Sequence, residues 1–196
     1  MTDSGQTLPL FIWATGAVLF AAFVFYVFAQ AAVLRNSAQS AADAAALAAA
    51  QDKRDELVAG LVGAVGSDAD WTRWLTGQAE AAPVSQAAAA RLAADNGASV
   101  LDLQTVEVNG FPGYEAHVRT NSTIGATLVP GTAGKHASAR ATAVVRPRCE
   151  ADPDVDSSKN IHFTCAQGKS FDFDIDGFDP SDLPDSSVMF AVSLAK

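Results

Sequence analysis

Apolar residues are distributed along this chain in two ways, and the first is a continuous apolar run near the N-terminus. No residue between Leu8 and Leu34 is charged. A helix of about 20 apolar residues spans the ~30 Å hydrocarbon core of a bilayer, and a backbone in hydrocarbon must make its hydrogen bonds within the helix. A buried helix of a soluble domain is disfavoured because the run is apolar on every face. The pattern therefore predicts one transmembrane helix over about residues 8–34.

A cleavable signal peptide is the second interpretation of the same run. Ala29-Gln30-Ala31 matches the small-residue pattern of a cleavage site. However, the residues before the run contain no Lys or Arg, and the run is longer than the apolar core of about 7–15 residues that a signal peptide has. We therefore favour an uncleaved membrane anchor.

The apolar run continues into an alanine-rich segment that keeps the helical pattern. Alanine is the strongest helix former, and no helix-breaking residue occurs between Arg35 and Gly60. A continuous helix from Leu8 to Ala59 would be about 78 Å long at ~1.5 Å per residue. Small side chains allow close approach, which leaves two interpretations of the segment: a stalk that packs on its own domain, or a surface that packs between subunits. We divide the chain into a transmembrane helix with an Ala-rich stalk, residues 1–60, and an α+β domain, residues 61–196.

After Gly60 the pattern becomes that of a small domain, with helices first and strands later. A short helix is expected to place Trp71 and Trp74 on one face, which packs into the core or, alternatively, lies at the lipid interface. A second helix is expected from about Pro83 to a stop at Asn96-Gly97. From Ser99 onward, apolar and polar residues alternate with the period of a strand. The predicted strands are residues 99–108 and 114–120 about a turn at 109–113, then 123–129, 136–147, 160–166, 169–175 and 187–195. Helices followed by antiparallel strands predict an α+β fold.

A Gly-Gln dipeptide precedes the apolar run, an Arg follows it, and the sequence AADAAALAAA comes shortly after that Arg. The residues concerned are Gly5, Gln6, Arg35, Ala38, Gln39 and Ala41–Ala50. This combination resembles the N-terminal region of the Tad/Flp pilus-assembly proteins of the TadE and TadG group, over about the first quarter of the chain. The resemblance implies a bitopic envelope protein with pilin-like architecture and no enzymatic activity. It also implies that other pilus-assembly or envelope proteins are partners through the N-terminal helix.

The resemblance bears on N-terminal processing as well. Prepilin-type peptidases, in the families that this chain resembles, cut after a Gly that precedes the apolar helix, usually with a Glu five residues further on. Gly5 is placed in this way, but Leu10 stands at the position of the Glu, and no acidic residue occurs between Gly5 and Asp43. We therefore expect an anchored assembly factor that keeps its N-terminus, rather than a filament subunit.

Charge and cysteine content restrict the function classes further. The chain has a net charge of −9, and the residues from Cys149 onward hold ten acidic residues against three lysines. Without a basic patch for a phosphate backbone, nucleic acid is not an expected partner. The two cysteines, Cys149 and Cys165, predict a disulfide in a domain outside the membrane, because such a domain meets an oxidising environment. Two buried thiols are the alternative.

One local motif suggests a metal. Asp172, Asp174, Asp176 and Gly177 fit the opening D-x-D-x-D-G of a calcium loop, although Leu183 stands where the loop needs a bidentate Glu. The other interpretation is a strand that points Phe171, Phe173 and Ile175 inward and its Asp row to water. No motif for catalysis or for binding a cofactor is present, and each of the three histidines is expected to be a surface or hydrogen-bonded residue.

Together these patterns predict a non-enzymatic, single-pass membrane component of a Tad/Flp-type pilus assembly or secretion apparatus. Membrane lipid and other pilus-assembly or envelope proteins are its expected partners, and the C-terminal domain is expected outside the cytoplasm. The rule that Lys and Arg stay cytoplasmic opposes this orientation, since Arg35, Lys53 and Arg54 follow the span, but long domains translocate largely regardless of charge. The alternative function is a membrane-tethered envelope binding module, with or without calcium.

Overall fold

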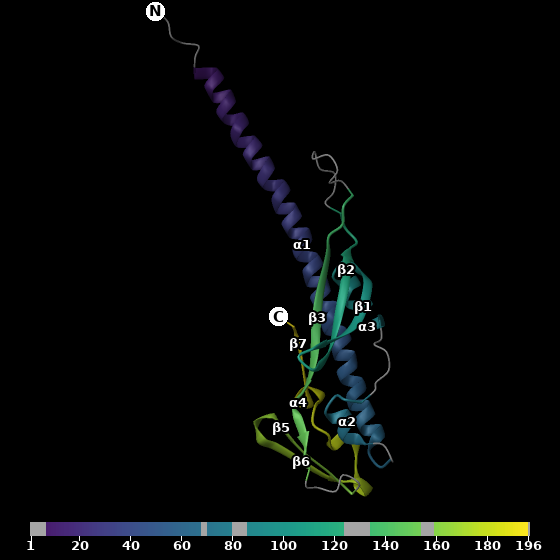
Figure 1. The fold of residues 1–196 in the computed structure, drawn as a ribbon. Coiled ribbons are helices and arrows are strands. Elements are labelled where there is room, and N and C mark those ends of the chain that lie inside the picture. Colours follow the sequence, from purple (N-terminus) through teal and green to yellow (C-terminus); the bar gives the residue numbers. More distant parts are fainter. Residues whose placement is uncertain (1–6, 68–69, 80–85, 124–133, 154–158, 196) are drawn as a thin grey trace, which may run out of the picture.

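One long helix organises the molecule. The protein is described here from a computed structural model, which covers residues 7–67, 70–79, 86–123, 134–153 and 159–195. Helix α1 (Thr7–Ala64) projects its N-terminal half away from a domain that packs around its C-terminal half (Figure 1). The short helices α2 (Trp71–Leu75) and α3 (Gln86–Asp95) follow, and then the strands. The predicted long helix and α+β class are confirmed.

Helix α1 continues past the expected end at Ala59 to Ala64 and so contains Gly60. A Gly inside a helix costs roughly 0.5–1 kcal/mol relative to Ala. Tertiary packing explains why the helix continues: a Cβ atom on Gly60 would lie 2.6 Å from Cδ2 of Trp74, so the indole fills the space that the absent side chain leaves. Trp71 is buried and Trp74 is partly buried against the core, as the sequence predicted.

The larger sheet has four antiparallel strands in the order β1-β2-β3-β7. Its strands are β1 (Ala98–Val108), β2 (Phe111–Thr120), β3 (Ser138–Pro147) and β7 (Phe190–Leu194). Strands β1 and β2 are joined by Asn109 and Gly110, which both have positive φ, 54° and 81°, as a type I′ hairpin turn requires. The turn is therefore shorter than the expected 109–113, and Phe111 already belongs to β2.

Two other expected strands differ from the structure. The segment 123–129 lies outside the described residues, apart from Thr123. The last strand does not begin at Ser187: helix α4 (Ser186–Met189) comes first, and β7 starts at Phe190. The reason is an N-cap, because Asp185 Oδ1 accepts a hydrogen bond from the Ser187 N–H at 2.8 Å. Alternation of apolar and polar residues carries no information about such a cap.

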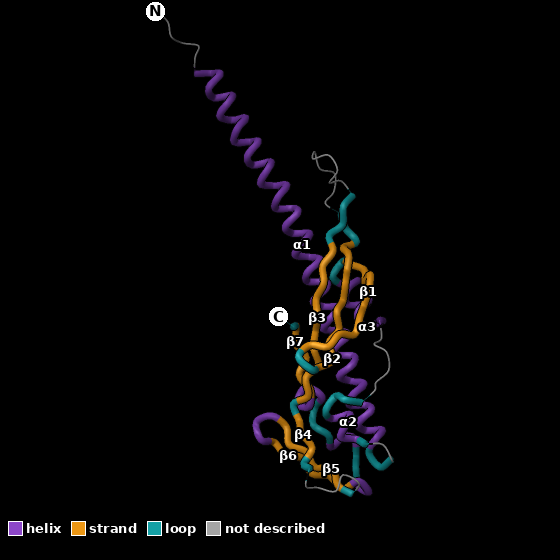
Figure 2. Tube along the Cα trace, viewed as in Figure 1, coloured by secondary structure: helices purple, strands orange, loops and turns teal. Residues whose placement is uncertain are grey.

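A smaller sheet lies at the end of the molecule farthest from the exposed half of α1 (Figure 2). Its strands are β4 (Cys149–Ala151), β5 (Asn160–Cys165) and β6 (Lys169–Asp174), in the order β4-β5-β6. Its rings form a cluster: Phe171 and Phe173 lie 5.3 and 6.3 Å from Phe163, centroid to centroid. The 3₁₀ turns Ala166–Gly168, Ile175–Gly177 and Pro180–Asp182 connect β5, β6 and the C-terminal elements.

The core lies between α1 and the inner face of the larger sheet. The alanine segment supplies one side of it, and none of its core alanines is measurably exposed: Ala41, Ala42, Ala45, Ala46, Ala49 and Ala50. Strands β2 and β3 and helix α3 pack against α1. The C-terminal half of α1 is thus part of the folded domain, and the domain boundary expected at residue 60 falls inside this helix.

Candidate functional site

The exposed half of α1 is the largest apolar surface in the described part of the chain. Its large side chains project outward all around the helix: Trp13, Phe20, Phe25 and Phe28 are exposed by 81, 68, 79 and 71%. A monomeric soluble protein rarely leaves a contiguous apolar surface of this size uncovered. By length and composition this helix can cross a membrane. Among the residues that the structure describes there is thus one candidate transmembrane span, in the place that the sequence predicted.

The few polar side chains of this half are arranged to suit an apolar surrounding. Gln30 Nε2 donates a hydrogen bond to the hydroxyl oxygen of Tyr26, one turn earlier, at 2.6 Å. Pairing within one helix lowers the cost of placing an amide in a low-dielectric environment. Both side chains lie near the C-terminal end of the apolar run, where an aromatic residue with a polar tip suits a membrane–water interface.

The alanine-rich motif that follows has a structural role inside the chain. Its small residues let the backbone of α1 approach the inner face of β2 and β3 closely, and they are fully buried there. Of the two interpretations of the Ala segment, the structure shows packing on its own domain. This buried face is already occupied within the chain, and the surface of α1 that stays uncovered is its N-terminal half.

A partly buried polar cluster lies where α1 packs on the larger sheet. Lys53 is only 8% exposed, and its Nζ lies 2.8 Å from Oε2 of Glu56. Tyr114 of β2 is buried, and this burial, together with the negative charge of Glu56, raises the pKa of its hydroxyl to about 12. The buried tyrosine and the partly buried Lys53–Glu56 pair thus lie near each other where α1 packs on β2. Sequence reasoning missed this cluster, although Lys53 falls on the same helical stripe as Ala46, Ala50 and Leu57.

A second set of polar residues lies beside the alanine face, at the point where α1 passes the edge of β3. Gln39 Nε2 donates to Asp43 Oδ1 at 2.8 Å and to the backbone carbonyl of Arg140 at 3.4 Å. The guanidinium Nε of Arg140 lies 3.9 Å from Oε1 of Glu115. These residues line a groove of about 340 Å³ together with Ala141, Thr142, Leu194 and Ala195.

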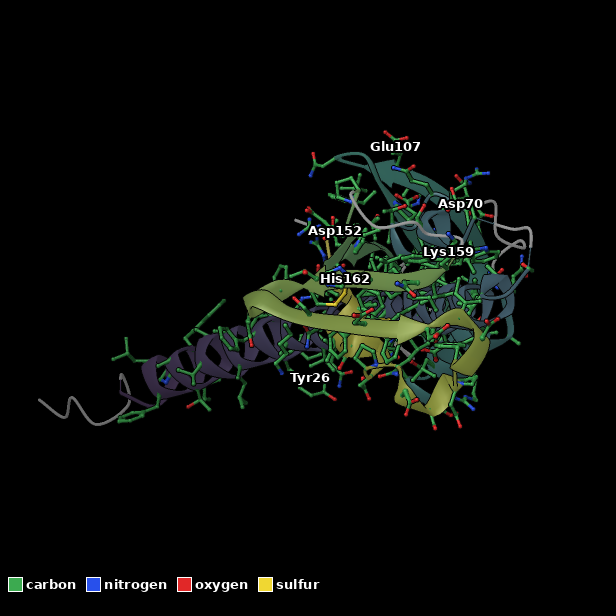
Figure 3. All side chains as sticks on the ribbon, turned by 90° about the horizontal axis from the view of Figure 1, so that it is seen from below. Tyr26, Asp70, Glu107, Asp152, Lys159 and His162 are labelled. Carbon is green, nitrogen blue, oxygen red and sulfur yellow. A yellow bond between two sulfur atoms is a disulfide. The ribbon has the colours of Figure 1, made fainter. Side chains whose placement is uncertain are left out.

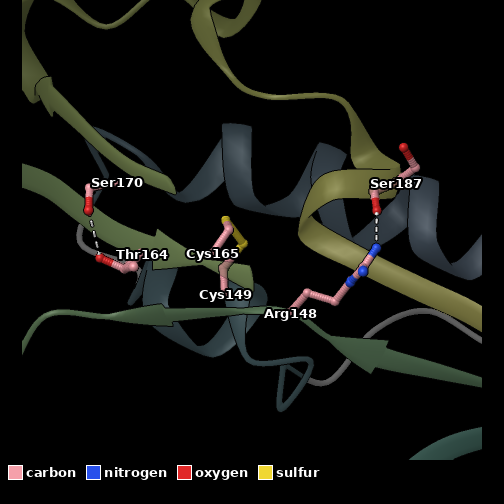
Figure 4. The surroundings of a disulfide bond; sticks show 6 residues. All are labelled: Arg148, Cys149, Thr164, Cys165, Ser170 and Ser187. Carbon is pink, nitrogen blue, oxygen red and sulfur yellow. Dashed lines mark hydrogen bonds between the residues drawn. A yellow bond between two sulfur atoms is a disulfide. The ribbon is translucent and has the colours of Figure 1, made fainter. Parts of the chain in front are cut away.

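The expected disulfide is present. Cys149 and Cys165 are directly opposite each other in the β4–β5 ladder and are bonded, and both are buried (Figure 4). The backbone on either side is also tied, since the Ala166 N–H donates to the Arg148 carbonyl at 2.8 Å and Arg148 Nη1 donates to the Ser187 carbonyl at 3.2 Å. The disulfide thus holds the smaller sheet at the point where the chain leaves β3.

The three aspartates of the calcium motif lie along an exposed strand and the turn after it. On β6, Phe171 and Phe173 are half-buried while Asp172 and Asp174 face outward. Asp174 Oδ1 accepts a hydrogen bond from the backbone N–H of Asp176 at 3.1 Å. Within the described ranges, no three His, Cys, Asp or Glu side chains come close enough to share a metal ion. The geometry therefore favours the edge strand over the calcium loop, and a calcium titration is needed to decide between the two interpretations.

Two of the three histidines, His136 and His162, have polar partners of an ordinary structural kind. His162 Nδ1 lies 3.3 Å from Asp152 Oδ2, beside the smaller sheet (Figure 3). His136 Nδ1 lies 2.7 Å from the carbonyl oxygen of Thr120. Neither contact places a nucleophile beside a base that is in turn oriented by a third group, which is the arrangement nucleophilic catalysis needs. The absence of a catalytic site remains an expectation.

With this geometry in place, the N-terminal segment can be compared with known families. Residues 5–52 match the Tad family model, described as "Putative Flp pilus-assembly TadE/G-like". The resemblance expected from the sequence is confirmed. The match covers the candidate span and the buried alanine face and ends before the two sheets, which lie outside it. No curated protein and no solved structure shows a significant match to the chain.

Proposed function

We propose that this chain is a non-enzymatic, single-pass membrane component of a Tad/Flp-type pilus assembly or secretion apparatus. The observation that carries the proposal is the coincidence of two features in one helix. Residues 5–52 match the TadE/G-like family, and the first half of the same helix is apolar and exposed on all sides. A helix of this kind anchors the domain in the membrane and leaves its lipid-facing surface available to other membrane helices.

The domain is proposed to lie outside the cytoplasm. The buried Cys149–Cys165 disulfide supports this orientation, because disulfides persist in oxidising compartments. The lack of an acidic residue between Gly5 and Asp43 supports an anchored assembly factor over a filament subunit. Mass spectrometry of the N-terminal peptide tests this last point, since a terminus at Gln6, methylated or not, would indicate a pilin-like subunit.

The membrane anchor is tested by a charge in the middle of the span. Phe20 lies near the centre of the run and is exposed, so Phe20→Arg places a guanidinium at the bilayer centre at a cost of about 2.5–3.5 kcal/mol on insertion scales. Phe20→Leu keeps the position apolar and is the matched control. We expect the parent and Phe20→Leu to resist carbonate extraction from membranes and Phe20→Arg to be extracted to a greater extent. Carbonate extraction of the parent and of Phe20→Leu would contradict a transmembrane anchor.

The assembly role is tested separately, by partner contacts of the span. A photoreactive residue in place of Phe20, in cells that express the whole apparatus, is expected to cross-link to another Tad/Flp protein identified by peptide mass spectrometry. The same residue in place of Leu101, which is 48% exposed on strand β1 of the domain, is the negative control. A span that cross-links only to lipid would favour the alternative of a tethered envelope binding module.

A further inference from the structure

The folded domain begins at the residue where the candidate span ends. No residue between Leu8 and Leu34 is charged, and Leu34, 8% exposed, is the first residue along the described part of α1 that the domain buries. A helix needs about 20 residues to cross the hydrocarbon core, so a span that starts at Leu8 leaves the core near Phe28. Residues 29–34 are then about 9 Å of helix, against roughly 5–8 Å for one headgroup layer. Because α1 is one continuous helix here, it holds the domain directly at the membrane surface.

The end of β2 and the start of β3 lie toward the exposed half of α1 (Figure 1). Gln39 Nε2 donates to the Arg140 carbonyl at 3.4 Å, which places these two residues at one height along the molecule. Arg35 lies one helical turn, about 6 Å, nearer the span than Gln39. Ser138 lies about 7 Å nearer the span than Arg140, at ~3.4 Å per residue, and it pairs with Arg119 of β2. Arg35 and Arg119 are therefore at about the same height above the membrane.

Three basic side chains lie at this span-facing end of the domain. Arg35 of α1, Arg119 near the end of β2 and Lys135 just before β3 are all exposed. In the described part of the chain, none of the three is paired with a carboxylate. Lys135 precedes Arg140 by five residues and so lies up to about 17 Å nearer the span. Their charged groups are available to an anion outside the chain.

The acidic residues of α1 and of the larger sheet lie behind these three basic residues. Those closest to the span are at the level of Arg140 or farther away: Asp43, Asp102 and Glu115. Glu115 is also 3.9 Å from the guanidinium of Arg140, which offsets its charge. Residues 124–133, between β2 and β3 in the sequence, contain no charged residue. The sheet and α1 thus present only basic charges to the span.

Helix α3 contributes one acidic residue to the same end. Asp95 closes α3, and the nearby Gly97 carbonyl accepts a hydrogen bond from the Asn121 N–H at 2.8 Å, just after β2. Arg91 lies one turn before Asp95 on α3 and carries the opposite charge. The span-facing end therefore remains basic, with Arg35 and Arg119 as well as Lys135 unopposed.

The opposite end of the domain is acidic. The smaller sheet lies farthest from the exposed half of α1 (Figure 2), and the chain from Cys149 onward holds ten acidic residues against three lysines. Charge is thus separated along α1, with the basic end toward the span. A negatively charged membrane surface attracts this end and repels the other.

We infer that the span-facing end of the domain docks on anionic phospholipid headgroups, with Arg35, Arg119 and Lys135 on lipid phosphates. The three residues come from separate elements and line no common groove, whereas a flat membrane surface can meet all of them at once. Each basic residue near an anionic surface strengthens such docking by about fivefold. Docking fixes the tilt of the domain and directs its acidic end away from the membrane. The inference rests on the proposed membrane anchor and deepens it.

The contact is measured in the full-length chain reconstituted into vesicles. A fluorophore on Ser138→Cys, an exposed position at the start of β3, reports by energy transfer how near it lies to an acceptor on lipid headgroups. Cys149 and Cys165 are bonded to each other and buried, so the new thiol alone is labelled. We expect higher transfer efficiency in vesicles of phosphatidylcholine and phosphatidylglycerol in equal parts than in phosphatidylcholine alone. High salt should remove the difference, because it screens exposed charges.

The decisive variant combines Arg119→Gln with Lys135→Gln and leaves Arg35 and the span unchanged. Its matched control combines Arg146→Gln, at the far end of β3, with Lys169→Gln in the smaller sheet, and so removes the same charge from elsewhere. We expect the first variant to weaken docking by about fivefold for each residue and to lose the response to phosphatidylglycerol. The control should keep that response.

A parent chain with equal transfer efficiency in both kinds of vesicle would overturn the inference and favour an acidic protein as the partner of this end. A response to phosphatidylglycerol that survives Arg119→Gln with Lys135→Gln would also overturn it, as would an equal loss in the control. Each of these results leaves the proposed function standing, provided that the parent resists carbonate extraction and position 20 still cross-links to a Tad/Flp protein. Extraction of the parent by carbonate would instead remove the membrane anchor and both proposals with it.

Discussion

Replacing Gly60 with alanine tests whether Trp74 decides how α2 docks on α1. In an unobstructed helix Gly→Ala stabilises by about 1 kcal/mol. At Gly60 the new Cβ would lie 2.6 Å from Cδ2 of Trp74 and closer still to Cε3 and Cζ3, so the ring must shift or leave the helix surface. Overpacking of this kind costs about 1–3 kcal/mol, which outweighs the gain in helix propensity. We expect a net destabilisation of up to about 2 kcal/mol.

Gly63 is the matched control, because it lies one turn later in α1 and a Cβ there would meet nothing within 4 Å. Gly63→Ala is therefore expected to stabilise the domain by up to about 1 kcal/mol. Pulse proteolysis in urea, on the full chain in detergent, measures both changes. In a Trp74→Ala background, Gly60→Ala should become stabilising because the obstructing ring is gone. If Gly60→Ala stabilises the parent chain as much as Gly63→Ala does, the packing argument is wrong.

The remaining predictions concern the disulfide, a buried tyrosine and calcium. Alkylation of the unreduced, denatured protein should modify neither cysteine, and reduction should lower the unfolding free energy by roughly 3 kcal/mol; labelling of either thiol would contradict the disulfide. Burial and the charge of Glu56 raise the pKa of the Tyr114 hydroxyl from 10 to about 12. The folded state therefore binds this proton more tightly than the unfolded state, and the stability that this provides is fully present below pH 10 and is lost as the pH rises to about 12. Relative to Tyr114→Phe, the parent should therefore lose about 2–3 kcal/mol between pH 10 and pH 12, and parallel pH profiles would refute the shift. Millimolar calcium should leave the melting temperature unchanged, since the three Asp side chains of β6 and its turn face outward; a rise that triple Asp→Asn substitution abolishes would restore the calcium site.

Local signals were enough to place most helices and strands. The absence of charge between Leu8 and Leu34 predicts the span, because burying a charge in hydrocarbon is costly whatever the rest of the chain does. The stop at Asn96-Gly97 and the tight turn at Asn109-Gly110 depend on backbone conformations that few other residues adopt. The disulfide followed from two cysteines and an expected compartment. Each of these inferences depends on residues close in sequence or on composition alone.

The tertiary structure decided which surfaces meet. Composition does not decide whether the alanine segment packs on its own domain or on another subunit, because a face of small residues fits any closely approaching partner. Only the fold shows that β2, β3 and α3 pack against this face. Gly60 signals a helix end in the sequence, and only the indole of Trp74, fourteen residues later, explains why the helix passes through it. The groove at Arg140 likewise needs α1, β3 and the end of β7 together. Hydrogen bonds between residues close in sequence determine where helices, strands and turns form. Contacts between residues far apart in the chain determine the core and the groove at Arg140.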